Sequence, residues 1–285
     1  MTGAETPAAA PPGLLAALEA QRARLGPFAA ILQYFETVGS TNDVAARLAD
    51  AGAPHGTTVV AAAQHHGRGR MGRAWFSPPG SGLYVSVLLR PQGFGAPTHR
   101  PGAAGAMDVG LASSVTLTAG VAIATAIRRA SGLPVQLKWP NDILVGRRKL
   151  CGILAEAAAG AKRLESIVLG FGVNLRAAGY PPDLAGRATS IEEELGRAAD
   201  ADFLLSEILA EFAGGLSAAV AEGFDAMLAR WRALSPSSSG APVEILAGDG
   251  RWEPARTAGI DRDGALLVAR AGTLHRVIAG EVRWL

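Results

Sequence analysis

The chain has 285 residues, of which 49% are hydrophobic and 18% charged, so it can form a large core and does not have the composition of a disordered protein. Its formal net charge is +2, which excludes the strong basic excess of a general nucleic-acid-binding protein and confines any anion-binding function to local clusters. The single cysteine, Cys151, excludes an internal disulfide framework and a cysteine-based structural zinc site, as is typical of a reducing compartment.

The N-terminal residues do not predict an export signal. The stretch MTGAETPAAAPPG contains Glu5 and several prolines in place of a basic start and an apolar core. We therefore expect a cytoplasmic protein, with residues 1 to about 12 disordered and one short helix over 14–25. The uncharged segment 109–127 is long enough to span a bilayer, but its serines, threonines, alanines and glycines favour a packed interior helix and no membrane attachment.

Short apolar runs alternate with helical patterns from residue 31 onward. They predict strands over 31–37, 57–64, 83–90, 135–139, 143–145, 149–156 and 166–175. They predict helices over roughly 41–50, 111–131, 201–220 and 223–234. A side-chain oxygen of Ser40 or Thr41 would cap the first of these helices. Gly170 and Gly172 alternate in the last strand and leave one face as bare backbone, which a ligand can approach closely.

The sequence SPSSSGAP over 235–242 is the best candidate for a domain boundary, because the composition changes there. Beyond it, short alternating strands with turns at 248–250 and 261–264 predict a small β-barrel. We therefore expect three parts: an N-terminal segment that is disordered or a short helix over 1–27, a large domain over 28–236, and a small barrel over 237–285.

An arginine-rich loop covers Gly67–Arg73, where three arginines are separated by glycines and Trp75 follows. In isolation this pattern fits a solvated surface loop, a nucleic-acid-binding arm, or a phosphate cradle in which backbone amides and guanidinium groups surround an anion. A Walker-type loop is excluded, because no Gly-Lys-Ser/Thr follows and the chain continues into a strand. A lone tryptophan beside a strand is by itself more typical of a core residue.

Lys138 lies in an otherwise apolar strand, immediately before the turn Trp139-Pro140-Asn141-Asp142. A lysine there is costly unless it meets an anion, so it marks either an anion site or a charge that keeps an edge strand soluble. The pattern leaves both interpretations open. The pair His65-His66 does not predict a metal site, because adjacent side chains of a strand point to opposite faces and no third ligand is spaced for them.

Several motifs together resemble one known family, the bacterial biotin protein ligases. The resemblance is carried by STND at Ser40, GRGRMGRAWFSPPGSGLYVSVLLRP at Gly67, KWPNDILV followed by RKLCGILAE from Lys138, and GFGVNL at Gly170, in that order and spacing. The C-terminal GIDRDGALLV and GEV also resemble that family's small terminal domain, so the resemblance covers about 31–285. It implies an α+β fold, with a mixed or antiparallel sheet packed with helices in the catalytic domain and an SH3-like β-barrel at the C-terminus.

The chain departs from the family's pattern at several places. His65-His66 and Met71 replace more usual residues around the arginine-rich loop, and an insertion over 93–110 lengthens the link to the long helix. The N-terminal DNA-binding domain of the family's repressor subclass is missing. We therefore expect a monofunctional enzyme that does not have DNA as a partner.

The resemblance implies an ATP-dependent, AMP-forming ligase that works in two steps. Biotin and ATP, with Mg²⁺, give biotinyl-5′-AMP and pyrophosphate, and a lysine of a biotin carboxyl carrier protein then receives the biotinyl group. Neither step needs an enzyme nucleophile. The resemblance does not assign the protein ligands of Mg²⁺ or the oligomeric state, so both a monomer and a homodimer stay possible.

The expected site residues are carried over from the matching motifs. Lys138 and Arg70 are the expected catalytic residues, with Lys138 bridging the biotin carboxylate and the α-phosphate. The expected biotin-binding residues are Ser40, Thr41, Asn42, Gln64, Arg68, Gly69, Arg70 and Lys138. The expected ATP- or adenylate-binding residues are Arg68, Arg70, Arg73, Trp75, Asn141, Lys149 and Asn174. The loop over 176–190 matches the family's lid and is expected to be disordered without ligand.

Two other functions compete with this interpretation. A lipoate or octanoate ligase of related fold would need a narrower, more uniformly apolar tunnel, and the polar set Ser40, Asn42 and Gln64 favours biotin. A basic nucleic-acid-binding module built on Gly67–Trp75 would show steeply salt-dependent oligonucleotide binding without ATP turnover.

Overall fold

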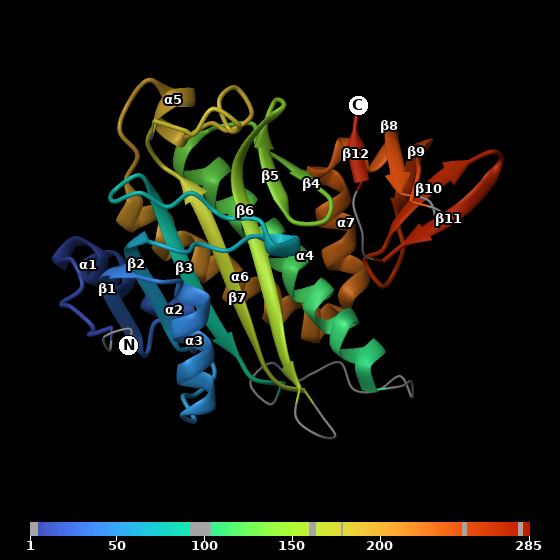
Figure 1. Cartoon of the computed structure of the whole chain (residues 1–285). Coiled ribbons are helices and arrows are strands. Elements are labelled where there is room, and N and C mark those ends of the chain that lie inside the picture. Colours follow the sequence, from blue (N-terminus) through green and yellow to red (C-terminus); the bar gives the residue numbers. More distant parts are fainter. Residues whose placement is uncertain (1–4, 92–103, 160–163, 178, 247–249, 279–281) are drawn as a thin grey trace.

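A computed structural model describes residues 5–91, 104–159, 164–177, 179–246, 250–278 and 282–285. Its strands form two sheets, a seven-stranded sheet in the larger part of the protein and a five-stranded sheet near the C-terminus (Figure 1). Most of the insertion over 93–110 lies outside the described residues.

The large sheet is mixed, and its strands follow the predicted ones closely. Their spatial order is β1-β2-β3-β7-β6-β5-β4, and every adjacent pair is antiparallel except β1 with β2. β7 is the central strand and is buried along almost its whole length, which explains its continuous apolar run. The strands are β1 (Leu32–Val38), β2 (Thr58–Gln64), β3 (Gly82–Leu89), β4 (Gln136–Lys138), β5 (Asp142–Val145), β6 (Arg148–Ala159) and β7 (Leu164–Asn174).

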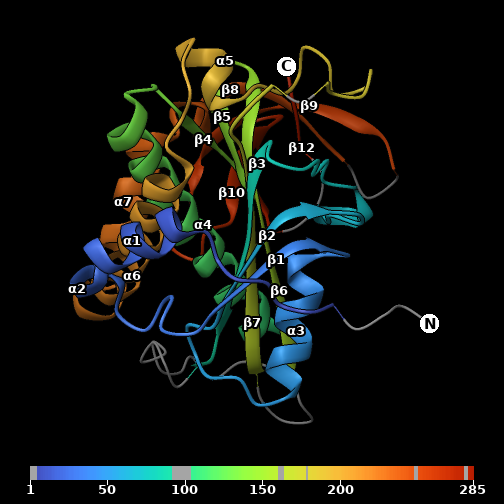
Figure 2. The same cartoon turned by 90° about the vertical axis from the view of Figure 1, so that its left-hand side faces the viewer.

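Helices cover the two faces of this sheet unequally (Figure 2). α3 lies on one face against β2, β3 and β7, and the other longer helices lie on the opposite face. The predicted helix over 14–25 is divided at Gln21, and a short helix that periodicity did not predict follows the loop after β7. The helices are α1 (Pro12–Ala20), α2 (Arg22–Leu25), α3 (Thr41–Asp50), α4 (Ala104–Ser131), α5 (Ile191–Leu195), α6 (Ala201–Glu222) and α7 (Phe224–Leu234). Together with the mixed sheet they confirm the predicted α+β class.

The two longest helices are apolar because they pack inside the protein. Gly110–Ser131 of α4 and the whole of α6 are long and apolar enough to cross a membrane by length and composition, yet 56% and 50% of their apolar windows are buried. Ile123 and Ile127 of α4 and Leu209 of α6 are fully buried in the core. This packing agrees with the predicted interior helix.

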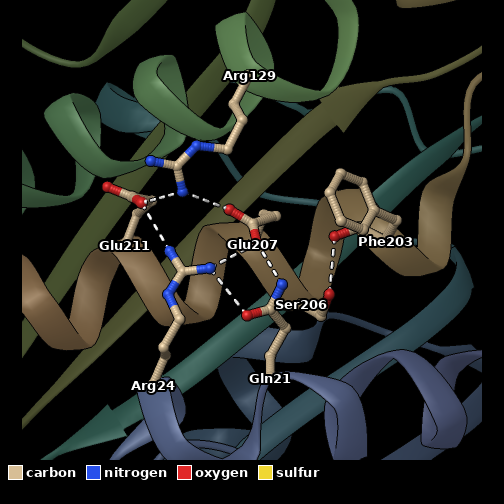
Figure 3. Close-up of polar contacts among 7 residues, drawn as sticks. All are labelled: Gln21, Arg24, Arg129, Phe203, Ser206, Glu207 and Glu211. Atoms are coloured by element: carbon tan, nitrogen blue, oxygen red, sulfur yellow. Dashed lines mark hydrogen bonds and ion pairs between the residues drawn. The ribbon is translucent and has the colours of Figure 1, made fainter.

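An ion cluster fastens the N-terminal helices to the helical layer (Figure 3). Glu207 of α6 is 2% exposed, and its carboxylate accepts hydrogen bonds from Arg24 (2.7 Å) and Arg129 (2.8 Å). Glu211 accepts hydrogen bonds from the same two arginines. Burial alone would raise the pKa of Glu207, but these hydrogen bonds outweigh it and hold the pKa below its usual value. The cluster thereby ties α2 to α4 and α6.

Residues 5–11 were expected to be disordered, but they contact the edge strand β1. The amide of Ala8 donates a hydrogen bond to the carbonyl of Tyr34 (2.8 Å). The carboxylate of Glu5 accepts a hydrogen bond from the amide of Gly39 (2.6 Å), just before α3. These contacts attach the segment to the sheet through hydrogen bonds that composition does not reveal.

The small sheet is antiparallel, with the spatial order β11-β10-β9-β8-β12, which is consistent with the predicted small barrel-like domain. It packs against the end of the large sheet, where Trp139 Nε1 donates a hydrogen bond to the carbonyl of Gly264 (3.0 Å). The boundary expected within 235–242 stays a prediction. The strands are β8 (Ser239–Leu246), β9 (Trp252–Ile260), β10 (Leu266–Arg270), β11 (Thr273–Val277) and β12 (Val282–Trp284).

Candidate active site

The arginine-rich loop connects β2 to β3 and is folded onto itself. The amide of Gly69 donates to the carbonyl of Arg73 (2.7 Å), and the amide of Trp75 donates to the carbonyl of Gly67 (2.8 Å). Met71 has a φ of 58°, in the left-handed region that a turn requires, and Gly72 follows with a φ of 71°. The loop is therefore a structured element that holds its arginines and its tryptophan in defined places.

One end of the site is a network of neutral polar groups, which we call the polar end. Its members come from the start of α3 and from the strands and loop beneath it: Thr41, Asn42, Gln64, Ser77 and Ser86. Gln64 Oε1 accepts hydrogen bonds from the amide (2.9 Å) and the hydroxyl (3.1 Å) of Thr41, while its Nε2 donates to Ser77 (2.9 Å). Ser86 donates to Thr41 (2.8 Å) or to Asn42 (2.6 Å).

The expectation that Ser40 or Thr41 caps this helix with its own side chain is wrong. Ser40 is buried at the N-cap position and makes no side-chain capping bond. The carboxamide of Gln64, which arrives from β2, accepts the free amide of Thr41 instead. A hydrogen bond therefore connects the STND motif directly to Gln64, although the two are far apart in the sequence.

Asn42 and Arg68 both meet a carboxylate that the sequence analysis did not select. Asn42 Nδ2 donates to Glu156 Oε2 (2.6 Å), and the guanidinium of Arg68 donates to the same oxygen (2.8 Å) and pairs with Asp43 (2.8 Å). Glu156 thus links the start of α3 to the arginine-rich loop. Ser86 was missed too, although a serine inside the apolar run LYVSVLL is a polar group that needs a buried partner.

The floor of the site is a strip of bare backbone formed by Gly152, Gly170 and Gly172, which we call the glycine strip. Gly152 of β6 lies directly opposite Gly172 of β7 in the antiparallel register. A Cβ atom on Gly170 would collide with the Asn42 carboxamide, and one on Gly172 would collide with the indole of Trp75. Two residues along a strand span about 7 Å, so the strip leads from the polar end to the place where Trp75 lies.

Trp75 lies on the glycine strip and is not part of the hydrophobic core. A Cβ atom on Gly152 would come within 2.9 Å of its ring. Its Nε1 is buried and has no hydrogen-bond partner among the described residues. Lys149 Nζ lies 5.4 Å from the centre of the ring. The indole therefore covers the glycine backbone at the site. Packing alone does not explain this position, because the buried Nε1 has no partner there in the described part of the chain.

The other end of the site is positively charged, and we call it the cation cluster. It contains Arg70, Arg73, Lys138, Lys149 and Arg187, and the carboxylate of Asp142 lies close to Arg70, Lys138 and Lys149. Lys138 lies opposite Asp142 in the antiparallel register of β4 and β5. Lys149 Nζ lies 2.5 Å from Asp142 Oδ1. Among the described residues, the cations that act on Lys138 outnumber the carboxylates that do so, and this local positive charge is complementary to an anionic ligand.

Two members of the cation cluster, Lys138 and Arg70, are partly buried. Burial lowers the pKa of Lys138, Asp142 opposes this shift, and the positive charges of Lys149, Arg187 and Arg73 add to it. Burial also lowers the pKa of Arg70, against the effect of Asp142. β4 is an edge strand, but Lys138 is partly buried among other charges, which favours an anion site over a charge that only keeps the edge soluble.

Asn141 and Asn174 have structural partners in the protein. Asn141 Nδ2 donates to the carbonyl of Ile153 (2.6 Å), and Asn174 Nδ2 donates to the carbonyl of Thr189 (2.9 Å). The second bond fastens the loop over 176–190 to the sheet. In the same place the amide of Lys149 donates to the carbonyl of Arg187 (2.8 Å) and the amide of Thr189 to that of Lys149 (3.0 Å).

The loop over 176–190 therefore delivers Arg187 to the cation cluster, a residue that the sequence analysis missed. The expected disorder of this loop without ligand stays a prediction. Among the described residues, no group of three or more His, Cys, Asp or Glu side chains is placed to hold a metal ion.

A hollow of about 550 Å³ lies elsewhere, between α4, α6 and α7 on the opposite side of the sheet. Its lining is mostly alanine, glycine and threonine, with charged residues among them. It holds none of the predicted site residues. The convergence of polar groups, bare backbone and desolvated cations identifies the α3 side of the sheet as the candidate active site.

The sequence matches known proteins over most of its length. Residues 34–174 match the biotin/lipoate A/B protein ligase family. The chain is 31% identical over 255 residues to the bifunctional ligase/repressor BirA of Bacillus subtilis, covering 88% of this chain and 73% of that protein. It is 32% identical over 252 residues to the biotin–[acetyl-CoA-carboxylase] ligase of Paracoccus denitrificans, covering 85% of this chain and 96% of that protein.

Solved structures share the fold. The biotin protein ligase of Aquifex aeolicus, in complex with biotin and ATP, superposes with a TM-score of 0.73 at 24% identity, covering 90% of this chain and all of that one (100%). The biotin protein ligase of Leishmania major in complex with biotinyl-5-AMP gives a TM-score of 0.54 at 26% identity, covering 90% of this chain and 98% of that one.

Proposed function

Because the chain belongs to the biotin/lipoate A/B protein ligase family, we propose that it is a biotin protein ligase. It activates biotin with ATP to biotinyl-5′-AMP and transfers the biotinyl group to a lysine of a biotin carboxyl carrier protein. The observation that carries this proposal is the order of the three parts of the site. A neutral polar end and a desolvated cation cluster are joined by a strip of bare glycine backbone.

Each part of the site suits one part of the ligand. The ureido group of biotin is a neutral donor and acceptor, which matches the carboxamides and hydroxyls of Asn42, Gln64 and Thr41. The apolar bicycle and its chain suit the ring of Trp75, which lies against the glycine strip. The biotin carboxylate and the phosphates of ATP are anions, and they match the cation cluster with Lys138 and Arg70 at its desolvated centre.

The first step joins a biotin carboxylate oxygen to the α-phosphorus of ATP, and the bond from that phosphorus to the pyrophosphate oxygen breaks. Two anions must come together, so the chemistry needs neutralising charges that are already in place. Lys138 supplies such a charge to both the carboxylate and the α-phosphate, and Arg70 offers a fork of donors to phosphate oxygens. Trp75 shields the labile acyl phosphate from water.

The second step transfers the acyl group to the carrier. The neutral amine of the carrier lysine attacks the acyl carbon, AMP leaves with the oxygen that had bridged carbon and phosphorus, and the nitrogen loses a proton. No residue of this chain forms a covalent bond. Cys151 agrees with this, because it is fully buried and burial raises the pKa of its thiol, which keeps the thiol protonated.

Mg²⁺ fits this site as an ion that arrives with the nucleotide. It prefers oxygen ligands and keeps several waters, so phosphate oxygens supply most of its coordination. Asp142, the carboxylate within the cation cluster, is already paired with Lys149. When bound, the ion would add positive charge to the departing pyrophosphate.

The two competing functions fit the site less well. A lipoate or octanoate chain has no ureido group that could exchange hydrogen bonds with the carboxamides and hydroxyls of the polar end, whereas biotin has one. A nucleic-acid-binding arm needs free arginines, whereas Arg68 is bound to Glu156 and Asp43, and Arg70 is largely desolvated. In this proposal the enzyme acts in the cytoplasm on a soluble carrier, with neither DNA nor a membrane as partner.

Exchange of labelled pyrophosphate into ATP tests this function. Purified protein with Mg²⁺ is given biotin, lipoate or octanoate, and we expect exchange with biotin alone. Exchange with lipoate or octanoate would reassign the acid substrate within the family. If none of the three acids supports exchange while an oligonucleotide binds with a steep salt dependence, the nucleic-acid function replaces this proposal.

A further inference from the structure

The small C-terminal sheet reaches the cation cluster through one aromatic side chain. Trp284 is the last residue of β12, and the centre of its ring is 5.7 Å from Lys138 Nζ at the end of β4. Its strand is held in place by pairing with β8, where Trp284 lies opposite Val243. A residue more than 140 positions away in the sequence therefore touches the central lysine of the proposed reaction.

The Trp284 indole is not placed there by a hydrogen bond of its own. Its Nε1 is buried and has no hydrogen-bond partner among the residues that the structure describes. A buried N–H group without a partner destabilises the fold. If Trp284 served only for packing, an apolar side chain with no N–H group would therefore be expected at this position. The aromatic face, which is turned to a cation, is the part of the side chain with an evident interaction.

Lys138 needs an interaction of this kind. It is desolvated, and the positive charges of Lys149, Arg187 and Arg73 repel it. The neighbouring carboxylate of Asp142 is shared with Lys149 at 2.5 Å. An aromatic face attracts an ammonium group without adding a negative charge that would repel the phosphates of a substrate. A second carboxylate could hold Lys138 equally well, but it would oppose substrate binding.

The β4 strand is also fastened to the small sheet next to this contact. Trp139, the residue after Lys138, donates its indole hydrogen bond to the carbonyl of Gly264 (3.0 Å). The backbone of Lys138 and its ammonium group are thus fixed from the same side. We propose that Trp284 is a positioning residue that holds the ammonium group of Lys138 in the cation cluster through its aromatic face, so that the C-terminal sheet completes the adenylation site. The catalytic consequence of this inference rests on the proposed function, whereas the contact between Trp284 and Lys138 does not depend on that function.

The kinetic test compares three variants of the full chain in biotin-dependent pyrophosphate exchange. Trp284→Ala should lower kcat about 5- to 30-fold, the range that a desolvated cation–π contact can give. Trp284→Phe keeps an aromatic face and should recover most of this loss. Trp252→Ala is the matched control, because it removes an indole from the same sheet that contacts Arg283 (3.7 Å), and it should leave kcat nearly unchanged. Equal kcat for Trp284→Ala and Trp252→Ala, or no recovery with Trp284→Phe, would overturn the proposal.

A pH profile separates positioning from a general loss of structure. The aromatic face favours the charged form of Lys138, so its removal should move the alkaline fall of kcat to lower pH. A Trp284→Ala variant with reduced kcat and an unmoved alkaline limb would contradict the proposal, because a merely misfolded fraction lowers the rate equally at every pH.

A direct measurement does not depend on activity. The sequence contains three lysines, Lys138, Lys149 and Lys162, so the NMR signals of ¹³C-dimethylated amines are few and can be assigned with Lys138→Arg. We expect Trp284→Ala to move the signal of Lys138 and lower its titration midpoint. An unchanged Lys138 signal would refute the contact. If wild-type protein showed no exchange with any acid but this signal moved, the proposed function would fail and the contact would stand.

Discussion

The two ends of the site are built on opposite principles. At the polar end the carboxamide groups of Gln64 and Asn42 have hydrogen-bond partners within the protein, and these groups hold one another in place without a ligand. At the cation cluster Asp142 is bound to Lys149, and Lys138 lies partly buried near the positive charges of Lys149, Arg187 and Arg73. The polar end is complete in itself, whereas the cation cluster is complete only with an anion. We expect the first arrangement to stabilise the fold and the second to become more favourable when an anion binds.

The largest effect should come from removing the centre of the cation cluster. Lys138→Ala takes away the charge that meets both the carboxylate and the α-phosphate, and we expect biotin-dependent pyrophosphate exchange to fall at least about 100-fold. Arg147→Ala, in the exposed turn after β5, is the control and should retain activity. Near-native exchange by Lys138→Ala would remove Lys138 from the mechanism.

A smaller effect should follow from filling the glycine strip at the polar end. Gly170→Ala places a methyl group against the Asn42 carboxamide, and overpacking of this kind costs about 1–3 kcal/mol. We expect biotin to bind about 10-fold more weakly by calorimetry, with a lower melting temperature. Gly214→Ala in α6 meets open space and should be neutral or slightly stabilising. Unchanged biotin affinity in Gly170→Ala would show that the strip does not receive the ligand.

Stability should change with opposite sign at the two ends. Gln64→Ala leaves the Thr41 amide and Ser77 without their partner and should lower the free energy of unfolding by about 1–3 kcal/mol. Lys138→Met replaces the partly buried lysine with an uncharged side chain of similar length. It should raise the free energy of unfolding by about 1 kcal/mol, as substitutions that relieve functional strain do. Urea denaturation of both variants measures the two values. A destabilised Lys138→Met would contradict the picture of a strained cation cluster.

The smallest effect should be the response to salt. Screening weakens the attraction between the cation cluster and ATP, so raising the ionic strength from 0.05 M to 0.5 M should increase the KM for ATP about two- to five-fold. Binding of biotin in the absence of ATP depends more on neutral hydrogen bonds and should change less. A larger change for biotin than for ATP would mean that the two ends have been assigned the wrong way round.

Periodicity and turn chemistry predicted most elements of the large sheet from the sequence. α3 begins at Thr41 and ends at Asp50, as the pattern indicated, because an apolar stripe and a change of composition mark both ends. The N-terminal contact of Ala8 with Tyr34 was not predictable, since a single hydrogen bond to an edge strand leaves no periodic trace. The short α5 was missed for a similar reason, because five residues show too little of a helical period.

The site was predictable where residues are locally unusual. Lys138 in an apolar strand and glycines at alternate positions attract notice without any structure. Glu156 and Arg187 were missed because each lies in a segment where a charge is ordinary, and only the fold brings them to Arg68 and to the cation cluster. An unusual residue can be recognised in the sequence, but the residue that it contacts is often of an ordinary type and becomes evident only in the fold.

The hydrogen bond from Trp139 to Gly264 has a consequence for the order of events during synthesis. A ribosome releases the strands and helices of the large sheet well before residue 264 emerges, and domains generally fold from the N-terminal end as they appear. Until then the indole of Trp139, which is 3% exposed in the finished protein, has no partner on the C-terminal sheet. Until the C-terminal sheet is complete, the nascent chain therefore carries the strand of Lys138 without the hydrogen bond that fastens it.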